Sequence, residues 1–142
     1  MRGVRRERVW GPGCRRTGRG VVHAEWVGAP SDESAADARR ELTRLLTSWE
    51  LDDEAVEDAL LVVTELLENV VVHARTPFRL SVRRQGPLLH VTVADDRVGG
   101  PPYAPNVAAG RVSGLRLVTA VALRWGWHEH EAGKTVWVEL VV

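Results

Sequence analysis

The sequence predicts a two-layer α+β sandwich, in which helices cover one face of a mixed β-sheet. Three observations support this fold class. Two stretches of helical periodicity come early in the chain, four strand-like runs fall in its second half, and 142 residues leave room for one domain. The expected order is strand, two helices, two strands, long loop, helix and two strands.

The first 20 residues differ in composition from the rest of the chain. They contain seven arginines, five glycines and a single glutamate. Such segments bury too little apolar surface to fold, so we expect residues 1–20 to form a basic, disordered arm and residues 21–142 the domain. The alternative is an arm that touches nucleic acid or an acidic partner, because arginine pairs with phosphates and carboxylates. We expect no nucleic-acid partner.

Composition also excludes several protein classes. The apolar runs are interrupted long before the roughly 20 residues that span a bilayer. The arginine-rich start is followed by no apolar stretch of the kind that forms a secretory signal. We therefore expect a cytoplasmic protein without a membrane partner. A lone cysteine, Cys14, excludes an intramolecular disulfide and a cysteine zinc site.

The first half of the domain is expected to contain one strand and two helices. Residues 21–27 have the β-branched and aromatic content of a strand. Ser31 or Asp32 is a helix cap, and the helix that follows should run to about Trp49. Its apolar residues recur at helical spacing and should face the core. They are Ala35, Ala38, Leu42, Leu45, Leu46 and Trp49.

The second helix should begin after the cap candidate Asp52 and reach about Ala74. Thr76 and Pro77 then break it. Two strand-like runs follow, at residues 78–84 and 88–94, with a turn at 85–87, so an antiparallel hairpin is expected.

A long loop is expected at residues 95–113, which are rich in glycine, proline and alanine. Loops beyond about 12–15 residues in a compact domain are functional lids or disordered segments. A helix should follow over residues 114–125. The chain should end in a hairpin of strands 127–131 and 135–142 that turns at 132–134.

Candidate site residues lie on the second helix. Glu65, Asn69 and His73 are four residues apart, which places their side chains along one stripe of the helix. Core-forming residues flank this stripe, so its polar groups border the buried side and need partners. The alternative is a solvated helix edge with weak pair interactions.

Residues 64–74 around this stripe resemble the N box of the GHKL ATPase superfamily. Gyrase, histidine kinases and anti-sigma kinases share the ATP-binding fold of this superfamily, called the Bergerat fold. The resemblance implies that Asn69 holds the Mg²⁺ that bridges the nucleotide phosphates, and that Glu65 orients or deprotonates the attacking group. It places His73 on the nucleotide-binding helix. Oxygen ligands suit Mg²⁺, a hard cation that keeps several waters.

A second stretch, residues 91–95, resembles the strand that ends in the family's adenine-reading carboxylate. The resemblance implies that Asp95 accepts a hydrogen bond from the adenine amino group, with Asp96 as the adjacent alternative. Residues 133–140 resemble the final strand motif, in which a threonine helps to hold adenine. The resemblance assigns this role to Thr135.

A third stretch, residues 113–118, resembles the glycine box at which the lid meets a helix. It implies that the backbone at Gly114 and Leu115 faces the phosphates, as helix N-termini suit anions. The resemblance also implies that Arg111 of the lid reaches the terminal phosphate. Two positions depart from the pattern, since Arg97 and Val112 stand where the family has glycine. These departures put the phosphate approach in doubt.

Taken together, these stretches cover about residues 21–142 and resemble the anti-sigma regulatory factors and serine/threonine kinases of actinobacteria. The resemblance implies ATP and Mg²⁺ as cofactors, a sigma factor and/or an anti-anti-sigma antagonist protein as partner, and phosphorylation of that antagonist. A homodimer is left open. The alternative is a non-enzymatic, protein-binding regulator of the same fold with weak or no nucleotide binding.

Overall fold

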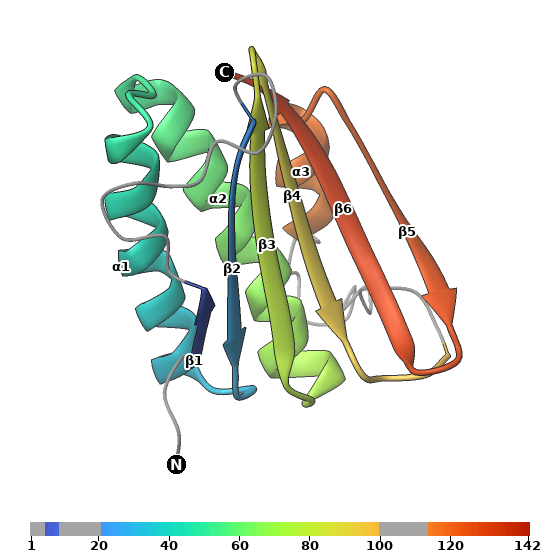
Figure 1. Cartoon of the computed structure of the whole chain (residues 1–142). Helices are drawn as coiled ribbons and strands as arrows, with labels where there is room; N and C mark the ends of the chain where they lie inside the picture. Colours follow the sequence, from blue (N-terminus) through green and yellow to red (C-terminus); the bar gives the residue numbers. More distant parts are fainter. Residues whose placement is uncertain (1–4, 9–20, 100–113) are drawn as a thin grey trace.

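The computed structural model describes the backbone of residues 5–8, 21–99 and 114–142, and the side chains of residues 21–99 and 116–142. Figure 1 shows helices packed behind a sheet of long strands. The elements in chain order are β1 (Arg5–Arg8), β2 (Val21–Gly28), α1 (Asp32–Ser48), α2 (Asp53–Asn69), the π-helical turn η1 (Val70–Ala74), β3 (Phe78–Gln85), β4 (Leu88–Asp95), α3 (Gly114–Val121), β5 (Arg124–His130) and β6 (Gly133–Val141).

The sheet contains six strands within the described residues, in the order β1-β2-β3-β4-β6-β5. Each described pair of neighbours is antiparallel, so the expectation of a mixed sheet is wrong. The reason is the path of the chain after β4. It returns through α3 to place β5 at the edge, and the tight β5–β6 hairpin then inserts β6 between β5 and β4, antiparallel to both.

The helices lie on one face of this sheet (Figure 1), which confirms the predicted α+β sandwich. Strand side chains alternate, and those that face the helices form the core with the apolar stripes of α1 and α2. The fully buried members include Leu42, Leu46, Val62, Leu66, Phe78, Leu80, Val91 and Val138. This alternation matters for the site, because it decides which strand residues face the helices.

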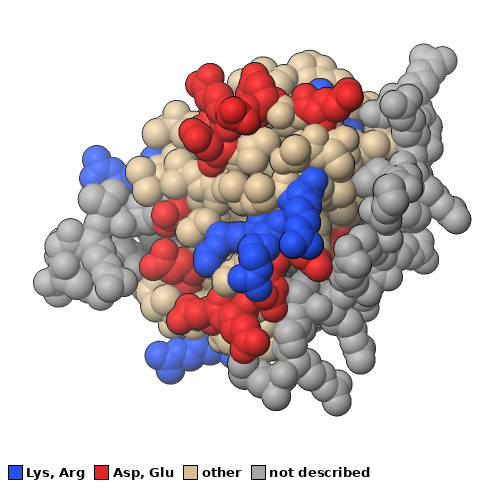
Figure 2. Space-filling view, turned by 90° about the vertical axis from the view of Figure 1, so that its left-hand side faces the viewer, with Lys and Arg blue, Asp and Glu red and all other residues tan. Residues whose placement is uncertain are grey.

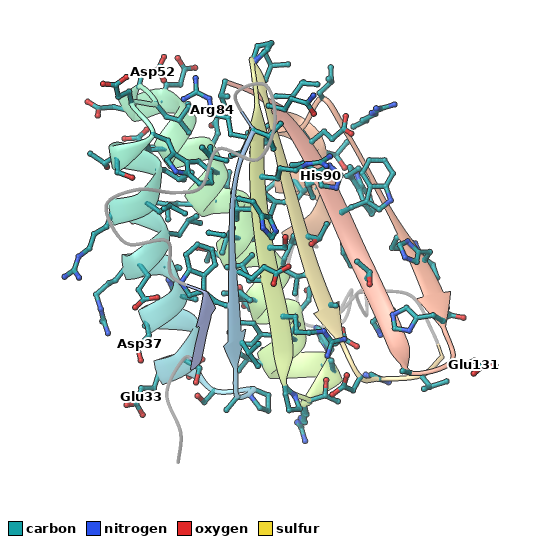
Figure 3. The ribbon with its side chains drawn as sticks, in the orientation of Figure 1. Glu33, Asp37, Asp52, Arg84, His90 and Glu131 are labelled. Atoms are coloured by element: carbon teal, nitrogen blue, oxygen red, sulfur yellow. The ribbon has the colours of Figure 1, made fainter. Side chains whose placement is uncertain are left out.

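The opposite face of the sheet carries no described helix and is called the open face here. It presents His90, which Figure 3 shows in front of the strands, and the partly buried Trp137. The rings of these two residues stack, with centroids 6.3 Å apart and planes inclined by 10°. The open face is therefore polar and aromatic, whereas the helix-facing side is apolar.

The starts of α1 and α2 are capped as the sequence predicts. The Ser31 Oγ atom accepts a hydrogen bond from the Ser34 amide at 3.1 Å, and Asp52 Oδ1 accepts one from the Ala55 amide at 2.8 Å. Of the two cap candidates for α1, Ser31 takes the role.

The boundaries near the end of the chain differ from the expected ones. Helix α3 ends at Val121 and β5 already begins at Arg124, so Trp125 is in a strand and not in a helix. Trp125 lies four residues after Val121 and two before Trp127, so it fits either periodicity. In the structure Trp125 adopts the strand conformation. It pairs with Val138 of β6, and its indole N–H donates a hydrogen bond of 2.8 Å to Thr119 Oγ1.

Part of the basic arm is ordered. Residues Arg5–Arg8 form β1, which pairs with β2 in an antiparallel ladder. The expectation of a disordered arm is therefore not met at these four residues, because the edge of β2 offers free backbone hydrogen-bonding groups. The other residues of segment 1–20 lie outside the described ones.

Charged side chains gather on the side of the molecule that α1 occupies. Figure 2 shows a basic band with acidic groups on either side of it. Asp37 and Arg40 of α1 form an exposed ion pair. No helix in the described part of the chain combines the length and the apolar character needed to cross a bilayer.

Candidate functional site

The end of α2 carries the first two candidate residues, Glu65 and Asn69. Regular α-helical geometry stacks their side chains one turn apart. Beyond Asn69 the helix widens into the π-turn η1, which closes when the Arg75 amide donates to the Val70 carbonyl at 2.7 Å. His73 lies in this turn, so the four-residue stacking joins Glu65 to Asn69 but does not extend regularly to His73. Such π-turns are frequent at functional sites.

Glu65 is partly buried, and its pKa is raised above the ordinary value of 4.5. Burial is the larger cause, because it disfavours the charged carboxylate, and the negative charge of Glu68 adds to it. A raised pKa makes the carboxylate a stronger proton acceptor than an exposed glutamate. The chemistry at this position therefore suits a general base.

Asn69 offers an unused polar atom. Its Nδ2 atom is buried, and no hydrogen-bond partner for it exists in the part of the chain that the structure describes. Leaving a buried polar group unpaired costs about 1–3 kcal/mol. The NH2 group is a donor, so a ligand that offers an acceptor, such as a phosphate oxygen, would satisfy it.

Asn69 is also compatible with a magnesium ion held jointly with a nucleotide. Among residues 21–99 and 116–142, no cluster of three or more His, Cys, Asp or Glu side chains forms a metal cage. Mg²⁺ does not need one, because it usually takes one or two protein oxygens and completes its shell with phosphates and water. The Asn69 amide oxygen is a ligand of this kind.

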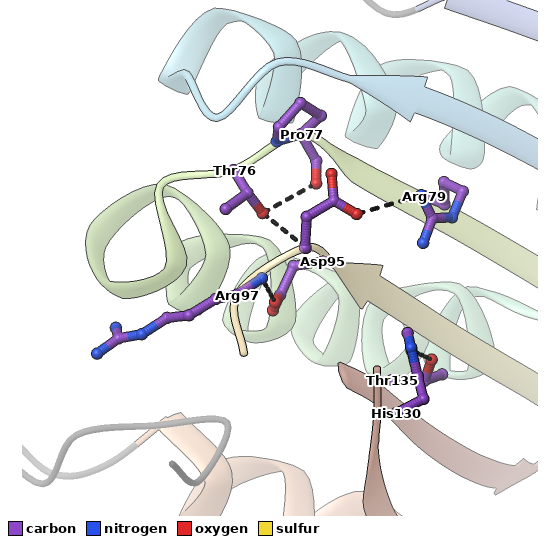
Figure 4. Close-up of polar contacts among 8 residues, drawn as sticks. Thr76, Pro77, Arg79, Asp95, Arg97, His130 and Thr135 are labelled. Carbon is purple, nitrogen blue, oxygen red and sulfur yellow. Dashed lines mark hydrogen bonds and ion pairs between the residues drawn. The ribbon is translucent and has the colours of Figure 1, made fainter. Parts of the chain in front are cut away.

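Asp95 lies at the end of β4, on the helix-facing side of the sheet, and is 4% exposed. Figure 4 shows how the residues around it are tied together. The Asp95 Oδ1 atom accepts a hydrogen bond of 2.9 Å from the Arg97 amide, whereas Asp96 points away and pairs with Arg79 at 3.5 Å. Of the two aspartates, Asp95 is therefore the buried one.

Arg97 stands where the resembling family has glycine, and it links two elements. Its Nη1 atom donates to the His73 carbonyl of η1 at 2.6 Å, while its amide binds Asp95. A second link joins the same segments, since the Asp96 amide donates to Thr76 Oγ1 at 2.9 Å. The structure thus brings the region of His73 to the end of β4.

Lys134 is the residue that faces Asp95 across the sheet. The two are cross-strand partners of β4 and β6, and the Lys134 Nζ atom lies 3.9 Å from Asp95 Oδ1. Both side chains are almost fully buried. The sequence assigned Lys134 to a turn, and only the strand register reveals it as a neighbour of Asp95.

Thr135 is not brought to Asp95. It pairs with Ala94 and His128, so it lies on the open face, where its hydroxyl is 3.5 Å from His130 Nε2 (Figure 4). Neighbouring strand residues point to opposite faces, so a single position decides this outcome. The place beside Asp95 that the resemblance assigns to a threonine belongs to Lys134.

The remaining candidates are Arg111, Gly114 and Leu115. Gly114 and Leu115 form the start of α3, where free backbone amides make a helix end suited to anions. The Leu115 side chain and all of Arg111 lie outside the described residues. Their expected roles stay predictions.

Comparison with known proteins gives one finding that covers most of the chain. Residues 29–140 match the family model described as histidine kinase-like ATPase domain. No curated protein matches the sequence.

Proposed function

The chain belongs to the histidine kinase-like ATPase domain family, an ATP-binding fold, and on this premise we propose that it is an ATP-dependent regulatory kinase. Its substrates would be Mg-ATP and a serine or threonine of a small antagonist protein. One observation carries the proposal: a partly buried glutamate with a raised pKa stands one helical turn from Asn69, whose buried Nδ2 atom has no hydrogen-bond partner among the described residues.

In the proposed reaction, the hydroxyl oxygen of the substrate serine or threonine attacks the γ-phosphorus of ATP. The bond from this phosphorus to the bridging oxygen breaks, and ADP leaves with the electron pair. Glu65 accepts the proton that the hydroxyl loses. Phosphoryl transfer needs positioning and charge neutralisation more than covalent help, so a single carboxylate and a well-placed phosphate suffice.

Asn69 would hold the magnesium ion through its amide oxygen, with the phosphates and water as the other ligands. When bound, the ion neutralises phosphate charge. The backbone at Gly114 and Leu115 and the side chain of Arg111 would meet the phosphates from the lid side. Asp95 would accept a hydrogen bond from the amino group of the adenine base.

The resemblance to actinobacterial anti-sigma factors supports a proposal for the partners. A sigma factor and/or its anti-anti-sigma antagonist would bind this domain, and phosphorylation of the antagonist would change which partner is held. The work of such a switch would be cytoplasmic, and a homodimer is compatible with it.

A second candidate function is a protein-binding regulator of the same fold that does not transfer phosphate. Two contacts of Asp95 favour it: the Arg97 amide occupies its Oδ1 atom, and Lys134 lies beside the same atom. A carboxylate that already has hydrogen-bond and ion-pair partners is less available to accept a hydrogen bond from adenine. Nucleotide titration separates the two functions.

Calorimetric titration of the purified chain with ATP, with and without Mg²⁺, tests the proposal. We expect saturable binding that depends on Mg²⁺, and we expect Asn69→Ala to lose this dependence. Glu57→Gln, an exposed change on the same helix, is the matched control and should bind as the wild type does. Absence of ATP binding by the wild type would rule out the kinase and favour the nucleotide-free regulator.

A further inference from the structure

Lys134 is the only lysine in a chain with 18 arginines, and it is buried. Its residue is 3% exposed, and it is one of few charged side chains that the described core contains. Buried charges need a partner or a function, since removing an ammonium group from water is costly. The described partner is Asp95, which is also buried.

The distance between the two groups shows that they do not satisfy each other fully. At 3.9 Å, Lys134 Nζ and Asp95 Oδ1 form an ion pair but are too far apart for a hydrogen bond, which needs about 2.7–3.2 Å. A carboxylate acceptor and an ammonium donor therefore lie side by side with a gap between them. A lysine ammonium carries three donor hydrogens, so it can serve Asp95 and a second acceptor together.

The backbone holds this arrangement in place. Direct cross-strand pairing of Asp95 with Lys134 points both side chains to the same face. Gly133, with φ of 150°, lets β6 approach so closely that a Cβ atom built on it would lie 2.0 Å from the Asp95 carbonyl oxygen. The positions of Asp95 and Lys134 are therefore fixed by two paired strands and not by a loop.

We propose that Lys134 is a base-recognising residue, which donates a hydrogen bond to a purine ring nitrogen while Asp95 accepts one from the neighbouring amino group. The proposal rests on the proposed function, because it assigns a specificity role within the same nucleotide site. Adenine has an amino donor with an acceptor nitrogen on either side, N1 and N7. An acceptor and a donor set side by side on the protein match this edge.

Lys134 also supplies the polar contact that the resemblance assigned to Thr135. A hydroxyl on the open face cannot reach a base that Asp95 holds on the helix-facing side. Lys134 supplies the second polar contact from the correct face, with a charged donor in place of a neutral one. Hydrogen bonds to charged groups are about twice as strong as neutral ones.

The test uses ATP analogues that lack one ring acceptor. Affinities for ATP, 1-deaza-ATP and 7-deaza-ATP, each with Mg²⁺, are measured by calorimetry on the wild type and on Lys134→Met. We expect the wild type to bind one of the two analogues about tenfold or more weakly than ATP. Lys134→Met should bind ATP about as weakly as that analogue and should not discriminate between them.

Three outcomes would overturn the inference. They are equal binding of all three nucleotides by the wild type, an unchanged analogue penalty in Lys134→Met, and tighter ATP binding by Lys134→Met, which would make Lys134 a competitor for Asp95. If the wild type binds ATP and one of these outcomes follows, the inference fails and the proposed function stands. If the wild type binds no ATP, both fail.

A second variant guards against misfolding, because Lys134→Met leaves the Asp95 carboxylate buried without its cation. Lys134→Gln keeps an N–H donor for this carboxylate but is one bond shorter. It should fold, as checked by near-ultraviolet circular dichroism, and show a smaller analogue penalty than the wild type. A penalty equal to that of the wild type would argue against a contact from Lys134.

Discussion

At the residue scale, the two ends of the candidate site differ in how well the sequence predicts them. Glu65 and Asn69 share one helix, so their spacing alone places them one turn apart. Asp95 and Lys134 come from different strands, and their meeting depends on register. A shift of one residue exchanges the faces, which explains why the family resemblance pointed to Thr135 whereas the structure places Lys134 beside Asp95.

A pH dependence follows from the raised pKa of Glu65. A carboxyl whose pKa is higher in the folded protein binds its proton more tightly there, so its stabilising contribution is present below about 4.5 and is lost as pH rises through the folded pKa. At neutral pH the buried charge is a cost that glutamine avoids. We therefore expect Glu65→Gln to raise the melting temperature of the nucleotide-free protein at pH 7 by a small amount.

The difference between wild type and Glu65→Gln should disappear as pH falls below about 4.5. Thermal melting followed by circular dichroism across this range provides the check. Glu57→Gln removes an exposed carboxylate of the same helix and should show no comparable trend. A lower melting temperature of Glu65→Gln at neutral pH would contradict a disfavoured charge. The same variant should lose phosphoryl transfer, so it would gain stability at the expense of activity.

Gly133 gives a second prediction at this scale. An alanine there would need a φ of 150° and would place its Cβ atom 2.0 Å from the Asp95 carbonyl oxygen, so the strand ends must separate. We expect Gly133→Ala to lower the free energy of unfolding by about 3 kcal/mol and to weaken ATP binding. Urea unfolding and calorimetry measure the two effects.

Gly86→Ala is the matched control for this change. Gly86 also has a positive φ, of 56°, but no atom lies within 4 Å of a Cβ built there. Only the backbone cost of about 1–2 kcal/mol should appear, without loss of ATP affinity. Equal effects of the two substitutions would show that the contact with Asp95 is not responsible.

At the element scale, helix starts were predictable and several element ends were not. Ser31 and Asp52 cap their helices through local hydrogen bonds, which the sequence shows directly. The π-turn at Val70–Ala74 has no such local signal, and Trp125 fits helical and strand spacing equally. Tertiary contacts decide both cases, as with the hydrogen bond from Trp125 to Thr119.

Arg97 provides a prediction about the stability of one element. Its guanidinium binds the His73 carbonyl at 2.6 Å and so ties η1 to the end of β4. Arg97→Ala should speed amide hydrogen exchange in residues 70–74, because the turn opens more often. The global free energy of unfolding should fall by no more than about 1 kcal/mol, since the lost hydrogen bond is solvent-exposed.

Hydrogen exchange followed by mass spectrometry tests this local effect. Arg79→Ala is the control, because it removes an exposed contact with Asp96 and leaves η1 untouched. Unchanged exchange in residues 70–74 of Arg97→Ala would show that the π-turn is held by other contacts. In Arg79→Ala, the amide hydrogens of residues 70–74 should exchange at the wild-type rate.

At the scale of the whole molecule, the order of elements predicted the fold class but not the direction of every strand. Helices on one face follow from the number and position of the amphipathic segments. The antiparallel sheet follows from the insertion of β6 between β4 and β5, which is a long-range event. The sequence holds no local signal for this insertion. The orders β4-β5-β6 and β4-β6-β5 both satisfy the same alternation of apolar residues along the strands.

The basic arm permits a prediction for the molecule as a whole. The buried apolar residues that the structure describes lie between Ala24 and Leu140, and we expect this core to fold without residues 1–20. A variant that lacks them should unfold in urea in one cooperative transition and bind ATP with unchanged affinity. Loss of β1 leaves the edge of β2 unpaired, so we expect a greater tendency to associate, visible by size-exclusion chromatography. Loss of the cooperative transition would mean that the arm, with its strand β1, is part of the folding unit.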